Sequence, residues 1–277
     1  MSETITRPAY AIAGGHTGRE RLRLVSRVMA DSTRRLLDDA GVRSGSSWLD
    51  VGCGGGDVSV ELARRVGAHG RVVGVDLDPV KLDIARDEAQ CLGLDHVEYL
   101  RGDACSGLPM QRFDGVYARF LLSHLAAPDK ALAAFRDRLA PGGCVVVEDI
   151  DASGHVAWPP DPAVHRYRKW LAVAMRRSGG DPDIGLRLPA LLRRAGFDAV
   201  QVRVVQPLAL EGEAKRLPAA TIAAMADTIG ALGLATSDEV RDVVAALEAF
   251  ADDPSTLIGT PRVFQVWGRR ADDVRAS

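Results

Sequence analysis

A glycine-rich turn between a strand and a helix is the first place in this sequence where chemistry could occur. Residues 49–57 read Leu-Asp-Val-Gly-Cys-Gly-Gly-Gly-Asp, and the apolar residues before the glycines predict a strand that ends at Val51. Glycines allow a sharp turn and let a ligand approach the backbone, while the helix that follows offers unpaired N–H donors. Such a turn also serves NAD, FAD or plain tight packing, so it does not identify a ligand by itself.

Two acidic residues at the ends of the next two predicted strands narrow the choice of ligand. Asp76 directly follows the predicted strand 71–75, at a position where a carboxylate can accept hydrogen bonds from the hydroxyls of a ribose. Asp103 follows the strand 97–100 and could accept a hydrogen bond from an exocyclic amine such as adenine N6. Either acid could instead cap a helix or form a turn. Because ligands bind beyond the carboxyl ends of such strands, the combination favours a nucleoside site.

The residue that opens the helix argues against a ligand with phosphates. Counted from Gly52, the NAD fingerprint G-x-G-x-x-G would place its third glycine at position 57, which is Asp57 here. An acid at the positive N-terminus of a helix would repel a pyrophosphate. No lysine of a phosphate-binding loop follows the glycines. The pattern therefore predicts an adenosine ligand without phosphates and disfavours an NAD-dependent reductase.

These motifs and their order resemble those of class I S-adenosylmethionine-dependent methyltransferases. Residues 49–56 are similar to the first motif of that family, and residues 75–76, 102–104 and 139–143 are similar to its later motifs. The flanks resemble a bacterial group of small-molecule methyltransferases that is loosely akin to the ubiquinone and menaquinone methyltransferases. The resemblance implies S-adenosyl-L-methionine as cofactor and S-adenosyl-L-homocysteine as product. It also implies an α/β fold: a doubly wound, seven-stranded, mostly parallel, Rossmann-like sheet with helical lid insertions.

The resemblance further implies which residues bind the cofactor. They are Asp50, Gly52, Cys53, Gly54, Asp76, Leu77, Asp103, Ala104, Arg119 and Tyr10. Asp50 would help to hold the ammonium group of the methionine moiety, and Asp76 would accept the ribose hydroxyls. Asp103 and the backbone N–H of Ala104 would bind adenine N6 and N1. Arg119 could reach the cofactor carboxylate or an acidic acceptor group, or it could form a salt bridge to a neighbouring loop.

Alternating strands and helices support this sheet independently of the motifs. Strands are predicted at 47–51, 71–75, 97–100, 115–118, 144–148, 200–205 and 263–268, and helices at 57–66, 79–92, 127–139, 162–177, 186–195, 217–232 and 237–252. Helices between consecutive strands imply parallel pairing through right-handed crossovers. Thr236 and Glu239 predict a capping box for the last helix.

The chain divides into three expected parts. Residues 1–45 form an N-terminal lid and an amphipathic helix, which either packs on the sheet or covers the site. Residues 46–151 form the cofactor-binding core. Residues 152–277 complete the sheet and carry helical substrate-lid insertions at about 152–183 and 207–261.

Methyl transfer from a sulfonium is an in-line displacement with a neutral leaving group, so the protein mainly has to align the reactants. A general base helps when the nucleophile is a hydroxyl. The expected candidates are Asp149, Asp151 and His155 at the end of the fifth strand, and His16 in a loop before the first helix. His124 is more typical of a packed histidine.

The helix 162–177 carries an apolar stripe, and the segment 207–261 offers a second apolar wall. An aliphatic enclosure favours a small organic acceptor. We therefore expect methyl transfer to a hydroxyl oxygen of a secondary metabolite. The alternatives are N- or C-methylation of a small molecule, or a cofactor-binding protein that catalyses a non-methylating reaction.

Composition excludes several other classes of protein. The net charge of −2 gives no reason to expect nucleic-acid binding, and no apolar stretch approaches the roughly 20 residues that span a bilayer. The four cysteines form no C-x-x-C pair, so no metal site is expected. We expect a cytoplasmic monomer or homodimer whose partner is the small-molecule acceptor.

The segment 9–20 generates a first prediction. Its glycines leave the backbone free to order when a ligand binds, and transfer chemistry needs shielding from water. We predict that Tyr10 or His16 faces the ligand, and that deletion of residues 1–18 leaves a folded protein with much weaker turnover. Hydrogen exchange in the segment should slow when cofactor and acceptor bind. A truncated protein with full activity would show the segment to be a passive tail.

Overall fold

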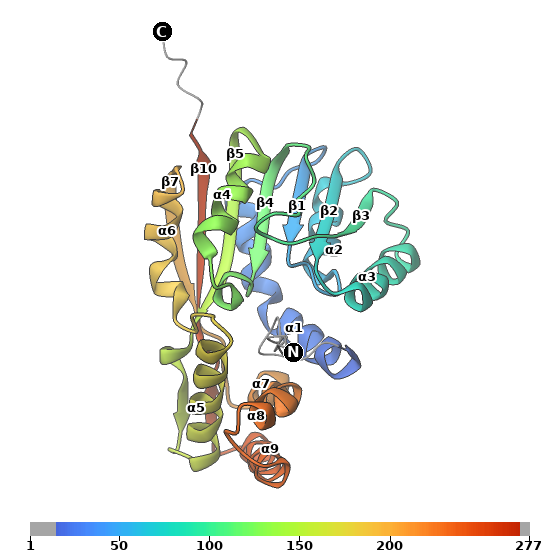
Figure 1. Cartoon of the computed structure of the whole chain (residues 1–277). Helices are drawn as coiled ribbons and strands as arrows, with labels where there is room; N and C mark the ends of the chain where they lie inside the picture. The colour runs from blue at the N-terminus through green and yellow to red at the C-terminus, as the bar shows by residue number, and fades with distance from the viewer. Residues whose placement is uncertain (1–14, 272–277) are drawn as a thin grey trace, which may run out of the picture.

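Seven strands form one sheet in the order β3-β2-β1-β4-β5-β10-β7 (Figure 1). The structure is a computed structural model that describes residues 15–271, with side chains from residue 18 onward. The strands are β1 (Ser47–Val51), β2 (Arg71–Asp76), β3 (Val97–Arg101), β4 (Phe113–Arg119), β5 (Leu139–Asp151), β7 (Phe197–Val205) and β10 (Arg262–Arg270). The first five are parallel, and β10 runs antiparallel to both β5 and β7. The predicted seven-stranded, mostly parallel sheet is confirmed.

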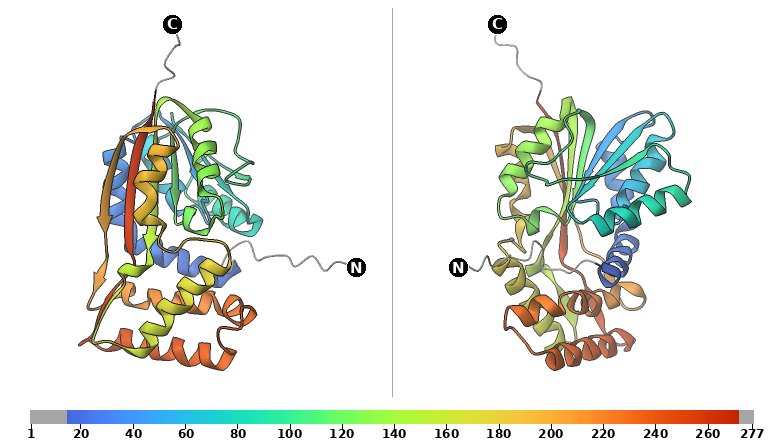
Figure 2. Two further views of the ribbon diagram at one scale, coloured as in Figure 1. Left: turned by 60° about the vertical axis from the view of Figure 1, so that its left-hand side comes forward. Right: turned by 45° about the vertical axis from the view of Figure 1, so that its right-hand side comes forward.

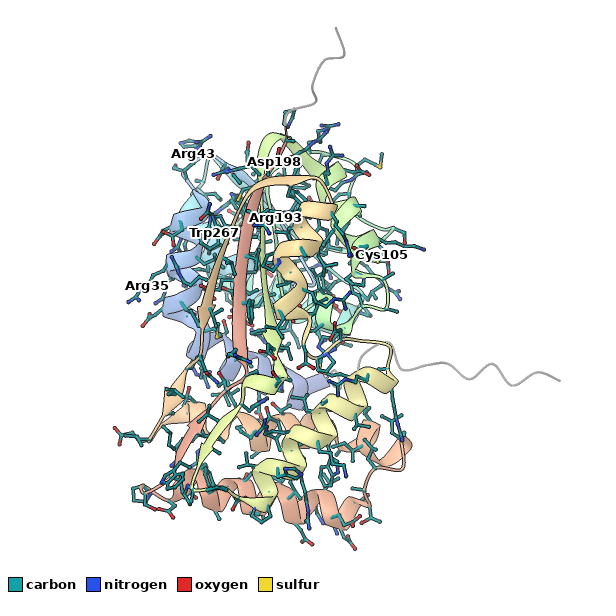
Figure 3. The ribbon with its side chains drawn as sticks, turned by 90° about the vertical axis from the view of Figure 1, so that its left-hand side faces the viewer. Arg35, Arg43, Cys105, Arg193, Asp198 and Trp267 are labelled. Atoms are coloured by element: carbon teal, nitrogen blue, oxygen red, sulfur yellow. The ribbon has the colours of Figure 1, made fainter. Side chains whose placement is uncertain are left out.

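Helices cover both faces of this sheet. They are α1 (Gly15–Ala40), α2 (Asp57–Val66), α3 (Pro79–Cys91), α4 (Pro128–Arg138) and α6 (Leu188–Arg194). On one face, α4 and α6 bury leucine and phenylalanine side chains against valines of the central strands. On the other, α2 and the last turns of α1 pack around Trp48, while α3 packs against Tyr99. Seen from the β7 edge in Figure 3, Trp267 of β10 lies on the α1 side and Arg193 of α6 on the opposite side.

A second body lies beyond the carboxyl ends of the parallel strands (Figures 1 and 2). Its helices are α5 (Pro162–Arg177), α7 (Leu217–Ala224), α8 (Ala226–Ala231) and α9 (Ser237–Asp252). A three-stranded sheet joins them, made of β6 (Val156–Trp158), β9 (Leu257–Gly259) and β8 (Leu208–Ala209) in that order. The apolar stripe of α5 packs against α7 and α9 in one buried cluster, so the two predicted insertions meet each other.

Short 3-10 helices connect these elements: η1 (Leu122–His124), η2 (Ala152–Gly154), η3 (Ile184–Arg187) and η4 (Glu213–Arg216). The capping box of α9 is confirmed, because the Thr236 hydroxyl accepts from Glu239 N–H and the Glu239 carboxylate accepts from Thr236 N–H. Among the helices that the structure describes, none combines the length and the apolar character needed to cross a lipid bilayer.

The structure differs from the sequence expectations at several places besides small shifts of element bounds. The helix predicted over 217–232 is interrupted at Met225, which is fully buried between α7 and α8. The strand β5 begins at Leu139, five residues before its predicted start at Cys144. The short strands β6, β8 and β9 were not predicted, because two or three residues are too few for an alternating pattern. His16 lies within the first turn of α1, so its expected loop position was wrong.

Candidate active site

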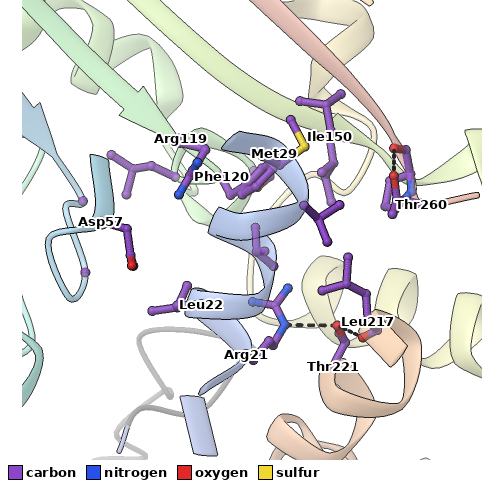
Figure 4. A pocket seen from close by; sticks show the side chains of 18 of the residues that line it. Arg21, Leu22, Met29, Asp57, Arg119, Phe120, Ile150, Leu217, Thr221 and Thr260 are labelled. Atoms are coloured by element: carbon purple, nitrogen blue, oxygen red, sulfur yellow. Dashed lines mark hydrogen bonds between the residues drawn. The ribbon is translucent and has the colours of Figure 1, made fainter. Parts of the chain in front are cut away.

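A cleft separates the carboxyl ends of β1, β2 and β4 from the second body (Figure 4). The empty space in it is about 1580 Å³, which includes open solvent at its mouth. Residues of α1 run between its two ends. One end is polar and holds the glycine turn, and the other is lined mainly by aliphatic side chains of α1, α5 and α7.

The glycine turn forms a floor that is free of side chains at the polar end. Gly52 and Gly54 have φ angles of 73° and 55°, which residues with a Cβ rarely adopt. A Cβ on Gly54 would also stand 3.3 Å from the Leu22 side chain of α1. Residues 52–54 nevertheless line the cleft, so a ligand there could contact the backbone of the turn.

Asp76 lies beside this floor, as the sequence pattern predicts. Its Oδ2 accepts a hydrogen bond from Gly54 N–H at 2.9 Å, and its Oδ1 accepts from Asp78 N–H at 2.9 Å. These bonds fix the carboxylate at the tip of β2 and leave lone pairs on both oxygens. A ribose with two adjacent hydroxyls fits such an acceptor.

Asp50 is buried under the same floor. It accepts a hydrogen bond of 2.6 Å from the Ser59 hydroxyl of α2, a partner that the sequence analysis did not identify. Burial raises the pKa of Asp50 to about 6, and this effect outweighs the hydrogen bond from Ser59 and the charge of Arg119. A cationic group placed nearby would favour the ionised form.

The adenine-binding residues that the resemblance implies are less close to the cleft. The cleft is lined by most of the residues expected at the methionine and ribose moieties: Asp50, Gly52, Cys53, Gly54, Asp76 and Arg119. It is not lined by the residues expected at the adenine, which are Leu77, Asp103 and Ala104. Asp103 Oδ1 accepts from Cys105 N–H at 2.8 Å and from the Ser106 hydroxyl at 3.1 Å, as in an Asx turn. Tyr10 lies outside the described residues, and the same holds for the side chain of His16.

The structure corrects the expected position of the three catalytic candidates on β5 and after it. Asp149 accepts from Ser123 N–H at 3.0 Å and from Ile150 N–H at 2.9 Å, and burial raises its pKa to about 6. Asp151 pairs with Arg262 at 2.6 Å. Neither these carboxylates nor His155 lines the cleft, because each is buried against partners from neighbouring segments.

His155 supports the wall of the cleft instead. Its Nδ1 lies 2.7 Å from the Ala152 carbonyl oxygen, which can only accept, so Nδ1 carries the proton. Its Nε2 then accepts from the hydroxyl of Tyr167, at 2.8 Å. Burial lowers the pKa of His155 to about 4, which keeps the ring neutral. The pair holds the Tyr167 side chain of α5 against the cleft.

His124 lines the cleft, although its sequence context is more typical of a packed histidine. It lies in η1, shortly after the carboxyl end of β4, and lines the cleft beside Ser123. Burial lowers its pKa to about 4, and the charges of Arg21 and Lys81 add to the effect. Its position after a strand end could have identified it, since ligands bind there in such sheets.

Arg19 ties α1 to the polar end of the cleft. Its guanidinium pairs with Asp57 at the start of α2, and with Glu88 of α3 at 2.6 Å. A Cβ on Gly55 would stand 2.6 Å from that guanidinium, so the arginine covers the glycine turn closely. Asp57, whose charge disfavours a pyrophosphate at this helix N-terminus, is therefore paired with an arginine of the protein itself.

The fold and the site of this chain are those of the class I S-adenosylmethionine-dependent methyltransferases. Residues 43–177 match the family model described as a methyltransferase domain. Over 208 residues the chain is 30% identical to the methyltransferase GfsG of Streptomyces halstedii, which covers 74% of this chain and 71% of that protein. The chain therefore belongs to this methyltransferase family.

Two further comparisons agree with this assignment. The ubiquinone/menaquinone biosynthesis C-methyltransferase UbiE of Idiomarina loihiensis is 37% identical over 117 residues, which are 41% of this chain. The chain thus matches about half, 46%, of that relative's length. The solved structure of a putative methyltransferase from Bacillus halodurans C-125 has a TM-score of 0.57 and 21% identity. The similarity spans 86% of this chain and 97% of that one, and shows the same fold.

The raised pKa of Asp50 generates a prediction about cofactor binding. An ammonium group beside Asp50 favours the carboxylate, so binding of S-adenosylmethionine should release a proton around pH 6. Affinity should then rise with pH through about 6 and level off above it. Calorimetric titration in two buffers of different ionisation enthalpy measures both effects. Asp50→Asn should weaken binding at neutral pH and remove the pH dependence, and equal pH profiles for both proteins would refute the role of Asp50.

Proposed function

We propose that the protein transfers the methyl group of S-adenosylmethionine to a hydroxyl oxygen of a small organic acceptor. One observation carries this proposal: the glycine turn with Asp76 opens directly into an apolar chamber that His124 also lines. A nucleoside-binding end and an acceptor end thus share one cleft.

The polar end fits the cofactor. The backbone of Gly52 and Gly54 would contact its methionine moiety, Asp50 its ammonium group, Asp76 its ribose, and Arg119 its carboxylate. When bound, S-adenosylmethionine supplies an electrophilic methyl group on a sulfonium. Because the leaving group is neutral, the protein needs no acid for it.

The apolar end keeps water away from the nucleophile. Its walls come from separate parts of the chain and are mostly aliphatic: Val25, Val28 and Met29 of α1, Leu171 and Met175 of α5, Leu217 and Pro218 of α7, and Ile258, Pro261 and Val263. An enclosure of this kind suits a small apolar molecule held in a fixed orientation. Its low polarity also leaves a hydroxyl nucleophile desolvated.

His124 is the residue we assign to take the hydroxyl proton. Its pKa of about 4 keeps the imidazole neutral near pH 7, so the ring has a lone pair to accept a proton. A base this weak accepts the proton only as the new oxygen–methyl bond forms and the oxygen becomes acidic. The hydroxyl of Tyr167 donates to His155, and Arg21 can only donate, so neither serves as the base.

Carbon methylation is the second candidate, because one relative is named a C-methyltransferase. An electron-rich ring carbon would occupy the same chamber as the hydroxyl oxygen. The carbon-13 spectrum of a product made with labelled cofactor distinguishes a methyl group on oxygen from one on carbon.

We predict that His124→Gln lowers kcat for a hydroxyl acceptor by about 100-fold, which is typical of the loss of a general base. The affinity for S-adenosylmethionine should stay unchanged. His165→Gln is a matched control, since His165 is an exposed histidine of α5. A His124 variant with the turnover of this control would exclude His124 as the base.

The proposed function itself is tested by binding and by transfer of label. Calorimetric titration should show binding of S-adenosylmethionine and no binding of NAD. A panel of phenols, alcohols and amines is then incubated with methyl-labelled cofactor, and label should enter phenols or alcohols. Binding of NAD alone would overturn the proposal. Cofactor binding with label only in amines would overturn the hydroxyl assignment.

A further inference from the structure

Arg21 brings a positive charge to the acceptor end of the cleft (Figure 4). Its Nε donates a hydrogen bond of 3.0 Å to the hydroxyl oxygen of Thr221 on α7. The buried Thr221 hydroxyl donates in turn to the Leu217 carbonyl oxygen at 2.7 Å. This chain of hydrogen bonds fixes the guanidinium in one orientation and leaves its two terminal nitrogens to the cleft.

No carboxylate of residues 18–271 lies within 4 Å of this guanidinium, which sets Arg21 apart from its neighbours on α1. Arg19 and Arg23 both pair with Glu88, and Arg27 pairs with Glu213. The carboxylates that line the cleft are Asp50, Asp57 and Asp76, all at its polar end. The acceptor end thus combines an aliphatic wall with a cation whose charge the described residues do not balance.

Arg21 is half-buried in the wall of the cleft, so an anionic ligand that displaces water there would compensate its charge. Burial lowers the pKa of Arg21, although an arginine stays protonated at neutral pH. A planar carboxylate matches two guanidinium N–H groups in charge and geometry. A phosphate carries up to two negative charges, and one arginine would leave part of that charge unbalanced among aliphatic side chains.

We propose that the methyl acceptor carries a carboxylate, and that Arg21 binds this carboxylate at the end of the chamber away from the glycine turn. The inference rests on the proposed function and adds the chemical class of the acceptor to it. The acceptor is then an apolar molecule with one acidic end. Anchoring that end fixes which of its atoms reaches the methyl group.

The neighbouring side chain shows why Arg21 belongs to the acceptor rather than to the cofactor. Consecutive helical residues point about 100° apart. Leu22 faces the glycine turn, where a Cβ on Gly54 would meet it at 3.3 Å, and Arg21 faces Thr221 of α7. The cofactor carboxylate is left to Arg119, which lines the polar end (Figure 4).

The test compares acids with their neutral amides on the full chain saturated with S-adenosylhomocysteine. Benzoate, 1-naphthoate and decanoate are titrated by calorimetry beside benzamide, 1-naphthamide and decanamide. At least one acid should bind about tenfold more tightly than its amide, as expected for a charge-assisted hydrogen-bonded pair. Arg21→Gln should abolish this preference and Arg21→Lys should restore part of it. Arg23→Gln, an exposed arginine on the same helix, should keep it.

Three other outcomes are distinguishable. Equal binding of acid and amide in every pair would overturn the carboxylate site and leave the proposed function intact. Weaker binding of S-adenosylhomocysteine by a folded Arg21→Gln protein would assign Arg21 to the cofactor and overturn the inference. A protein that fails to bind S-adenosylhomocysteine would contradict the proposed function, and the acid–amide comparison on the ligand-free protein would still test Arg21 separately.

Discussion

The ion pairs of Arg19 are the interaction on which the rest of the site depends. This buried guanidinium joins α1 to Asp57 and Glu88, and so holds the helix across the glycine turn. The following turns of α1 then run between the sheet and α7, where Arg21, Leu22 and Met29 line the cleft. The last turns pack on the sheet itself, so α1 is both a part of the core and a wall of the site. Removing the carboxylate of Asp57 or of Glu88 would leave the buried Arg19 with less compensating charge, and would destabilise the packing of α1 over the glycine turn.

Local sequence patterns were sufficient for the sheet and for the polar end of the cleft. The glycine turn, Asp50 and Asp76 lie close in the chain, and strand pairing brings their tips together. The acceptor end could not be read in this way, because Arg21 and Thr221 are 200 residues apart in sequence. The predicted position of Asp149 and Asp151 in the cleft was wrong for a related reason. Their partners, such as Ser123 and Arg262, come from segments that are distant in sequence but adjacent in space, and that hold Asp149 and Asp151 outside the cleft.

The two ends of the cleft differ in the chemical groups that line them. At the polar end, backbone and carboxylate groups offer hydrogen bonds to a nucleoside and a counter-charge to an ammonium group. At the other end, aliphatic side chains surround few polar groups, and the buried pair of His155 and Tyr167 keeps one wall in place. His124, which follows the carboxyl end of β4, lies between the two ends of the cleft. Under the proposed function, the polar end would bind the cofactor and the other end the acceptor.

The crystal structure of the complex with S-adenosylhomocysteine tests the central claim most directly. The ribose hydroxyls should lie within hydrogen-bonding distance of both Asp76 oxygens, with the homocysteine moiety over Gly52 and Gly54. The sulfur should face the apolar chamber, and Arg21 should not touch the ligand. A ribose bound away from Asp76, or a sulfur that faces solvent instead of the chamber, would contradict this account.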